Sequence, residues 1–439
     1  MVSGNSIGSA SFLVNRFAEG YTNQKNGVRM YAHEDQRKAE GRKMTRKLYY
    51  EDTCRKEFDA LATACEQKNG SYMVTLDASA FYPEGGGQSG DRGVLVLQDQ
   101  SRVDVLDTHE KGEDIVLTCS GPVPAGERVH GILDWEFRFD RMQNHTGEHI
   151  LSGLIHERYG YHNVGFHMSQ DRVTIDLDGE IPPDELALIE KKANEIVWAD
   201  LPVCVDVLPQ EKADQIEYRS KKKLEGEIRL VTIPGADVCA CCGTHVARTG
   251  EIGLIKILSH ERFRNGVRME IMCGRWAYEY MEEIFRQNHE VSVHLSSRMH
   301  ETGKAAQRLV EENARLKGDL TGMLFAQIDR MARELEGVGD VLLFAPDSDS
   351  RIAMKLTAKV METSGGSVFS FAGSDENGYK YAAGLKDGDL RSLVKEMNLS
   401  LNGRGGGKPY FQQGSIQAGR AEIEAFLRER YPKMTCSVF

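Results

Sequence analysis

The chain has 439 residues, of which 40% are hydrophobic and 28% are charged, and its formal net charge is −11. This length exceeds what one ordinary hydrophobic core organises, so two or three domains are expected. The composition is that of a globular protein, and no apolar run reaches the roughly 18 residues that a membrane-spanning helix needs. The acidic balance argues against indiscriminate nucleic-acid binding and is compatible with a local basic surface.

Residues 1–43 are polar and show no sustained hydrophobic period, so we expect an N-terminal extension that is not part of the folded core. No apolar segment with a small-residue cleavage site stands near the N-terminus, so a secretory signal is not expected. The nine cysteines are odd in number and mostly scattered, which does not indicate a disulfide framework. We therefore expect a cytoplasmic protein.

The pattern of the next segments predicts two domains. Short β runs such as "YMVTL" and "GVLVL", punctuated by Gly, Pro and Asp, predict a small barrel or an open β domain over 44–140. Residues 141–275 combine a helix from about Arg141 to Tyr159 with several strands and a second helix. They predict an α+β domain.

The remaining segments predict a helical connector over 276–338 and an α/β domain over 339–439. A glycine-rich loop, "NGRGGGKPYFQQGS", is expected between the last two helices. Gly318 and Gly322 argue against one unbroken helical rod in the connector. A heptad-like seam fits either an intermolecular coiled coil or a hairpin packed on its own domain. The seam consists of Leu309, Leu316, Leu320 and Met323. The expected fold class is α+β and multidomain.

The stretch "QNHTGEHILSG" places His145 and His149 four residues apart in a helix-like run. Residues i and i+4 share one face of a helix, so the two imidazoles can hold one ion. The stretch "CACCGTHV" offers a second pair, Cys241 and His245, again four residues apart. One thiolate with three imidazoles is a sound tetrahedral set that favours zinc over calcium or magnesium. Two exposed histidines on a helix are the alternative for the first pair.

The surplus of cysteines leaves the identity of the thiolate ligand open, because Cys239 or Cys242 can replace Cys241. A rival hypothesis also stands. "HTGEH" is a His-x-x-Glu-His pattern, in which the two histidines bind zinc and Glu148 is the general base of a peptidase. That hypothesis needs a further acidic ligand downstream and gives the Cys-x-x-x-His pair no purpose.

Several motifs in order resemble the editing region of alanyl-tRNA synthetases and their free-standing relatives, the AlaX trans-editing proteins. They are "FYPEGGGQSGDRG", "HTGEH", "CCGTH" followed by "TGEIGLIKI", "NGVRMEIMCG" and "GRGGGKPYFQQGS". The resemblance runs from about Met44 to the end, and the layout is similar to the long AlaX type. One departure is Cys242, which occupies a position where the family commonly has glycine. Alignment through "GTH" still indicates Cys241 as the ligand.

The resemblance implies a β-barrel domain, an α+β zinc editing domain and a C-terminal domain of the type called DHHA1. It also implies that His145, His149, Cys241 and His245 hold Zn²⁺. The family hydrolyses the ester of mischarged tRNA(Ala), chiefly Ser-tRNA(Ala) and sometimes Gly-tRNA(Ala). The 43 residues before the match are too few for an aminoacylation domain, so an editing factor acting in trans is expected. A zinc metallopeptidase and a non-catalytic tRNA-binding descendant of the editing fold are the alternatives.

Four residues beside the ligands are candidates for catalysis or substrate contact. Gln88 ends "GGGQ", whose glycines either let the backbone approach a ligand closely or form a tight turn. Thr146 and Thr244 can read a serine hydroxyl or brace their own turns. Glu148 follows a ligand-bearing face on the helix and is expected to point away from the metal, unless it serves as a partner or base. Whether zinc activates water or only positions the ester stays open.

Candidate tRNA contacts lie in two places. Arg268, in "NGVRMEIMCG", is a candidate for acceptor-stem phosphates. Arg404, Gly405, Gly406 and Lys408 belong to the glycine-rich stretch, where backbone N–H groups suit phosphate. The expected partner is mischarged tRNA(Ala). A homodimer through the helical connector or the C-terminal domain is a further expectation.

Overall fold

The computed structural model describes residues 44–169, 172–220, 224–346 and 348–439, so the expected N-terminal extension lies outside the described residues. Internal contacts divide the chain into two units, one ending at Gln287 and one beginning at Asn288. The division falls inside helix α6 (Arg275–His294). The fold mixes helices with several separate sheets, as the sequence predicts. No described helix has the length and apolarity that crossing a membrane requires.

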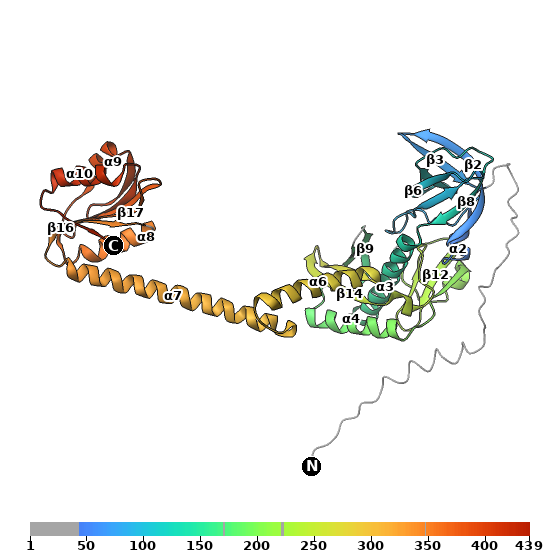
Figure 1. The fold of residues 1–439 in the computed structure, drawn as a ribbon. Coiled ribbons are helices and arrows are strands. Elements are labelled where there is room, and N and C mark those ends of the chain that lie inside the picture. The colour runs from blue at the N-terminus through green and yellow to red at the C-terminus, as the bar shows by residue number, and fades with distance from the viewer. Residues whose placement is uncertain (1–43, 170–171, 221–223, 347) are drawn as a thin grey trace, which may run out of the picture. The chain divides into compact units, whose positions relative to one another are not determined.

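The first unit begins with a closed six-stranded barrel in the order β2-β3-β7-β6-β5-β8, drawn in blue to teal in Figure 1. Buried and partly exposed residues alternate along β7, as a strand with one face in a core requires. The barrel strands are β2 (Glu57–Lys68), β3 (Ser71–Leu76), β5 (Gly93–Val96), β6 (Arg102–Lys111), β7 (Asp114–Cys119) and β8 (Arg128–Leu133). The short elements β1 (Arg46–Lys47), α2 (Leu48–Glu51) and β4 (Ala78–Ser79) precede or interrupt them.

The second part of this unit packs a long helix and a shorter one against a four-stranded sheet in the order β14-β15-β10-β9. These elements are α3 (Trp135–Tyr159), β9 (Asn163–Met168), β10 (Val173–Leu177), α4 (Pro183–Trp198), β14 (Ile255–Phe263) and β15 (Gly266–Cys273). A separate three-stranded sheet consists of β11 (Cys204–Pro209), β12 (Glu227–Ile233) and β13 (Asp237–Ala240), with α5 (Gln210–Ala213) and the 3₁₀ turn η1 (Thr249–Ile252) beside it. This core contains the helix that carries "HTGEH".

Helix α3 begins at Trp135, six residues earlier than the sequence pattern indicates. The Asp134 side chain accepts a hydrogen bond from the Phe137 backbone N–H and so caps the helix. The first turns contain charged residues, yet Arg138 and Asp140 are buried, because both form ion pairs. The first turns of α3 are therefore buried although their sequence is polar. Gly160 follows the last helical residue and caps the helix, with a φ of 70° in the left-handed region.

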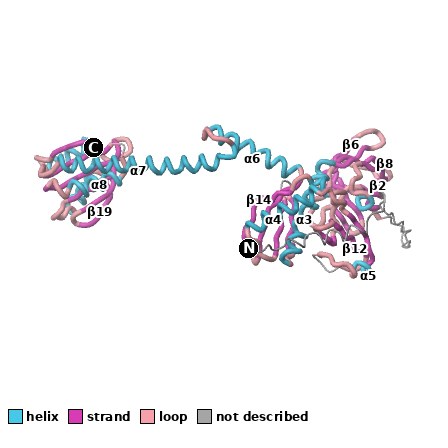
Figure 2. Tube along the Cα trace, turned by 90° about the horizontal axis from the view of Figure 1, so that it is seen from below, coloured by secondary structure: helices cyan, strands magenta, loops and turns pink. Residues whose placement is uncertain are grey.

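The second unit contains a long helix and a six-stranded sheet in the order β19-β20-β18-β17-β16-β21. Its helices cover both faces of the sheet, shown in cyan around magenta strands in Figure 2. The strands are β16 (Gly339–Ala345), β17 (Gly365–Ser374), β18 (Gly378–Gly384), β19 (Gly403–Lys408), β20 (Phe411–Ile416) and β21 (Thr435–Val438). The helical elements are η2 (Met299–Glu301), α7 (Thr302–Glu334), α8 (Ser350–Val360), α9 (Arg391–Ser400) and α10 (Arg420–Arg430).

Two expectations for this unit are wrong. Helix α7 runs without a break through Gly318 and Gly322, where an added Cβ would meet nothing within 4 Å. The "NGRGGGK" stretch is not a loop, because β19 pairs with β20 from Gly403 to Lys408 as an edge strand. Backbone pairing overrides the low strand propensity of glycine here. The four apolar residues of the heptad-like seam are exposed, with fractions between 53% and 70%.

Candidate metal centre

The candidate centre brings α3 together with the turn that follows β13. His145 and His149 lie on one face of α3, and Cys241 and His245 lie in the turn. Their four ligand atoms all fall within 4.8 Å of one another, and the Cys241 Sγ–His145 Nε2 distance is 3.5 Å. Ligands of a tetrahedral zinc ion, with bonds of about 2.0–2.3 Å, lie about 3.5 Å apart. The structure thus gathers the two pairs that are 96 residues apart in the sequence.

Each imidazole is held through its Nδ1, which leaves Nε2 facing the centre. His145 Nδ1 lies 3.0 Å from Gln88 Oε1, and His149 Nδ1 lies 2.9 Å from Asp237 Oδ2. His245 Nδ1 lies 3.3 Å from Thr146 Oγ1. Partners of this kind fix the orientation of metal-binding histidines. The Nε2 of His245 is buried and has no hydrogen-bond partner among the described residues, as a ligand atom without its ion would be.

The residues around the Cys241 thiol favour its ionised, thiolate form. Burial opposes ionisation of Cys241, yet His145 and His149 hold the pKa of its thiol well below the ordinary value. Burial lowers the pKa of His245 to about 3, so this imidazole is neutral at pH 7. Metal ligands must be a thiolate and neutral imidazoles, and Cys241 and His245 already have these forms. Despite burial, Cys241 and Asp237 hold the pKa of His149 well above its ordinary value, so this histidine has to lose a proton when a metal binds. The donor set therefore fits a metal ion that prefers nitrogen and sulfur.

The other two cysteines of "CACC" are placed differently. Cys239 belongs to a second cluster, with Asp237 and His149, which shares only His149 with the four-ligand cluster. Burial raises the pKa of the Cys239 thiol to about 11. Cys242 is exposed and does not belong to either cluster. Its φ is not positive, so the glycine of the family pattern is not required by the backbone here. The geometry favours Cys241 as the thiolate ligand.

Gln88 reaches the centre from the barrel side and is fully buried. Its Oε1 accepts from the Thr244 backbone N–H at 3.2 Å, and its Nε2 donates to Thr244 Oγ1 at 2.8 Å. The preceding Gly86 and Gly87 have φ of 62° and 91°, and Gly85 and Gln88 form a bridge across the turn. The glycines therefore make a tight turn that presents the Gln88 amide to His145 and to the Cys241–His245 turn.

Thr146 and Thr244 are also fully buried. Thr146 Oγ1 donates to Met142 O at 2.7 Å and accepts from the Val246 N–H at 3.2 Å. The hydroxyl of Thr244 is bonded to Gln88. Both hydroxyls support ligand-bearing segments. Gly243, between the ligands, cannot carry a side chain without displacing His145, because its Cβ would lie 2.1 Å from His145 Cε1.

Glu148 is buried and lies closer to the centre than helix geometry alone indicates. Its Oε2 is 3.9 Å from His149 Nε2, the atom that faces the centre. Its Oε1 accepts from Ser152 Oγ and from Asn163 Nδ2, both at 2.5 Å. The expectation that Glu148 points away from the metal is wrong, because the β9 residue Asn163 draws the carboxylate around the helix.

The candidate tRNA residues lie elsewhere. Arg268, on β15, makes two hydrogen bonds to Asp176 of β10 at 2.6 and 2.7 Å. Its guanidinium also lies 3.8 Å from the centre of the Phe263 ring. Arg404, Gly405, Gly406 and Lys408 form the exposed edge strand β19 in the second unit. Arg404 and Lys408 make no ion pair with a carboxylate within the described parts of the chain.

Sequence reasoning missed three residues that shape the centre. Asp237 binds His149 and is itself held by two hydrogen bonds from Arg219, each 2.7 Å. Phe166 stacks on His145 with an interplanar angle of 18°. Asp237 and Arg219 lie 18 residues apart on different segments, so no local spacing relates them.

Comparisons with known proteins identify relatives of two stretches of the chain. Residues 228–268, which include the Cys241–His245 turn, match the family "Threonyl and Alanyl tRNA synthetase second additional domain". Residues 15–137, which include the barrel, match the family "tRNA synthetases class II (A)". Two separate stretches of the chain are thus similar to domains of tRNA synthetases.

Whole-chain relatives narrow the assignment. The alanyl-tRNA editing protein AlaX-L of Pyrococcus horikoshii is 32% identical over 87% of this chain and 96% of its own length. The alanyl-tRNA editing protein Aarsd1 of Danio rerio is 28% identical over 88% of this chain and 97% of its own. The alanine–tRNA ligase of Pyrobaculum neutrophilum is 33% identical, but the match covers only 44% of that protein. The chain belongs to the AlaX family of alanyl-tRNA editing proteins, which confirms the resemblance seen in the motifs.

Proposed function

We propose that this chain is an aminoacyl-tRNA deacylase that acts in trans on mischarged tRNA(Ala). The substrates are Ser-tRNA(Ala) and, secondarily, Gly-tRNA(Ala). The observation that carries the proposal is the cluster of four ligand atoms within 4.8 Å, with every imidazole held through Nδ1. The relatives matched over most of their length are named for alanyl-tRNA editing, which supports the same substrate.

Zn²⁺ is the proposed cofactor, held by His145, His149, Cys241 and His245, because nitrogen and thiolate donors in a set of four suit zinc best. Bound zinc polarises an ester carbonyl or lowers the pKa of a bound water. The protein's own contribution is orientation and exclusion of solvent. Gln88, Thr146 and Asp237 hold the imidazoles, and the whole set is buried or nearly so. We propose Gln88, Thr146 and Thr244 as positioning residues.

Glu148 is a buried polar residue beside the centre that is not one of the proposed ligands. Its Oε1 is engaged with Ser152 and Asn163, so the carboxylate is fixed in orientation, and its Oε2 is directed toward His149 Nε2. In this position Oε2 can accept a hydrogen bond from a water or from the substrate amino group at the centre. We propose that it orients one of these two groups.

The peptidase alternative requires an acidic ligand beside the two histidines. The nearest carboxylate of that kind, Asp237, bonds His149 through Nδ1, the nitrogen that faces away from the centre. Cys241 and His245 supply the third and fourth ligand atoms instead. The geometry therefore supports the deacylase proposal over the peptidase one. The non-catalytic alternative predicts the same geometry and is separated only by assay.

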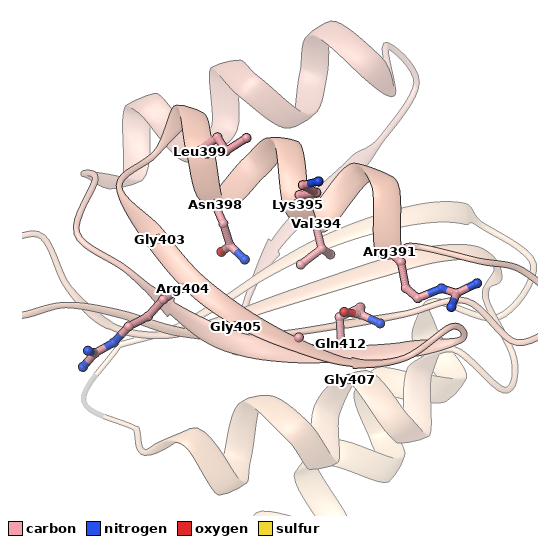
Figure 3. A pocket seen from close by; sticks show the side chains of 11 residues that line it. Arg391, Val394, Lys395, Asn398, Leu399, Gly403, Arg404, Gly405, Gly407 and Gln412 are labelled. Carbon is pink, nitrogen blue, oxygen red and sulfur yellow. The ribbon is translucent and has the colours of Figure 1, made fainter.

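We further propose the domain layout expected from the sequence: a barrel over 44–140, the editing domain over 141–275, a connector over 276–338 and a DHHA1-like domain over 339–439. In the last of these, a groove of about 520 Å³ lies between α9 and β19. Figure 3 shows Asn398 pointing from α9 toward the strand. We propose that β19 binds the body of tRNA through Arg404, Gly405 and Gly406, which line this groove, and through Lys408 at the end of the strand. We also propose a homodimer that forms through the seam of α7 or through this domain.

Zinc-loaded protein should release serine from Ser-tRNA(Ala), and removal of the metal by a chelator should abolish the release. Re-addition of Zn²⁺ should restore it, because all four proposed ligands belong to this chain. The measurement is release of labelled serine, with Gly-tRNA(Ala) and correctly charged Ala-tRNA(Ala) assayed in parallel. No serine release by the zinc-loaded protein sinks the proposal. Cleavage of peptides in its place supports the peptidase alternative.

Replacing Arg404 and Lys408 together by alanine should weaken tRNA(Ala) binding and reduce its salt dependence. Each lost phosphate contact lowers the slope of log K against log salt by about 0.7–0.9, so two contacts lower it by about 1.4–1.8. The matched control is Lys433→Ala, an exposed lysine beyond α10 in the same unit. Binding curves at several salt concentrations give the slope. An unchanged slope in the double variant excludes Arg404 and Lys408 as contacts to tRNA phosphates.

A further inference from the structure

A second cavity lies in the first unit, at the N-terminal end of α3. Its volume is about 280 Å³, and it is lined by residues from three segments. Arg92 comes from the barrel, just before β5, and the first two turns of α3 form one wall. Arg275 and Trp276, at the start of α6, form another. Neither the metal ligands nor their partners line it.

The three carboxylates in this cavity are already engaged. Asp134 caps α3 through the Phe137 N–H. Asp140 accepts from the Arg275 guanidinium and from Trp276 Nε1, the latter at 3.1 Å. Glu136 forms an ion pair with Arg275. These contacts pair Arg275 with two carboxylates.

The other two guanidiniums of the cavity, those of Arg92 and Arg141, have no carboxylate within ion-pair distance in the described residues. Arg141 is only 3% exposed, and its Nε is buried without an acceptor. Its Nη1 donates to the Phe137 carbonyl at 3.2 Å. Both guanidiniums lie over the Phe137 ring, Arg141 at 3.2 Å and Arg92 at 4.6 Å from its centre.

A buried cation without an ion pair is costly, and a second cation nearby adds to the cost. Burial accordingly lowers the pKa of Arg141 to about 10, and Arg92 contributes to the same shift, although the carboxylates of Asp140, Asp91 and Asp134 oppose it. Arg141 is still protonated at pH 7. An anion in the cavity would relieve both effects, and two guanidiniums match the geometry of phosphate oxygens.

We propose that this cavity is a phosphate subsite that receives one phosphodiester of the nucleic-acid strand bearing the scissile ester. The inference rests on the proposed function and extends it to the place where the strand is held. Arg141 lies four residues before His145 on α3, a rise of about 6 Å along the helix axis. The phosphate would therefore lie within a few nucleotides of the ester. Phosphate contacts of this kind fix register without reading sequence.

The test measures tRNA(Ala) binding by the zinc-loaded full chain at several salt concentrations. Arg92→Gln should lower the slope of log K against log salt by about 0.7–0.9, the effect of one lost phosphate contact. Arg102→Gln is the matched control, since Arg102 is an exposed barrel arginine at the start of β6 that does not line the cavity. It should leave the slope unchanged. Arg141→Lys keeps the charge and loses the planar fork, so it should weaken binding with the slope nearly preserved.

A second arm titrates inorganic phosphate against the same proteins and follows the Trp276 indole N–H signal by NMR. Wild type should show a shift that Arg92→Gln loses. An unchanged salt slope in Arg92→Gln overturns the proposal, and a phosphate-dependent shift beside that unchanged slope assigns the cavity to free phosphate instead. Serine release separates this inference from the function on which it rests. Release by wild type with an unchanged Arg92→Gln slope defeats only the subsite. A lowered slope without serine release defeats only the deacylase.

Discussion

Replacing Cys241 by alanine should reduce kcat/KM for Ser-tRNA(Ala) by at least about 100-fold, more than the loss of a ligand's hydrogen-bond partner usually costs. The thiolate is the only anionic donor in the four-ligand cluster, and its removal leaves three neutral imidazoles to bind the ion. Zinc content per chain should fall in the same variant. Serine release and metal analysis of the purified protein measure both effects.

The neighbouring cysteines provide matched controls for this variant. Cys242→Ala removes an exposed thiol, and Cys239→Ala removes one that belongs to a second cluster, with His149 and Asp237, and not to the four-ligand cluster. Both variants should keep stoichiometric zinc and most of the activity. If Cys239→Ala or Cys242→Ala loses zinc while Cys241→Ala retains it, the ligand assignment is wrong.

Arg138→Ala should lower the free energy of unfolding of the first unit by about 3–5 kcal/mol, the usual result of breaking a buried ion pair from one side. Arg138 is fully buried and binds Asp91, which is 1% exposed, through Nε and Nη2. Its Nη1 donates to Thr53 O at 3.1 Å, and Nη2 also donates to Ala80 O at 2.6 Å. One side chain on α3 thereby joins three barrel segments. Urea denaturation followed by tryptophan fluorescence measures the change.

An exposed ion pair of the same geometry is the control. Arg46 binds Glu51 through two hydrogen bonds of 2.6 and 2.7 Å, but the arginine side chain is 68% exposed. Arg46→Ala should cost less than about 1 kcal/mol, because water screens exposed pairs. The double variant Arg138→Ala with Asp91→Ala should recover part of the loss. Equal effects of Arg46→Ala and Arg138→Ala contradict the prediction.

The sequence was most informative where chemistry and local spacing coincide. The pairs His145/His149 and Cys241/His245 each have the spacing of a shared site, and the structure places all four side chains together. Repeated short β runs predict a small barrel or an open β domain, and the structure has the closed barrel. The sequence does not indicate strand β2, since "EFDALATACEQK" contains no strong alternation and is fixed by pairing with both β3 and β8.

Features that depend on distant partners could not be predicted. Arg268 looked like a free basic residue, but the register of β10 and β15 sets it opposite Asp176. Glu148 turns toward the centre because Asn163 of β9 reaches it. The glycines of β19 carry no strand signal of their own. Their pairing is determined by β20, against which Gly405 fits so closely that a Cβ would lie 2.3 Å from Gln413 O.

The position of Gln88 has a thermodynamic consequence. This barrel residue contacts both ligand-bearing segments. It binds His145 on α3 and Thr244 in the turn that follows β13. Docking of the barrel and ordering of the ligands are therefore linked equilibria. An ion that binds only the assembled arrangement stabilises the barrel junction by RT ln(1 + [ion]/Kd), about 2.7 kcal/mol at one hundred times Kd. Under the proposed function, metal supply then governs both how firmly these two folded parts of the chain adhere and whether an ester is cleaved.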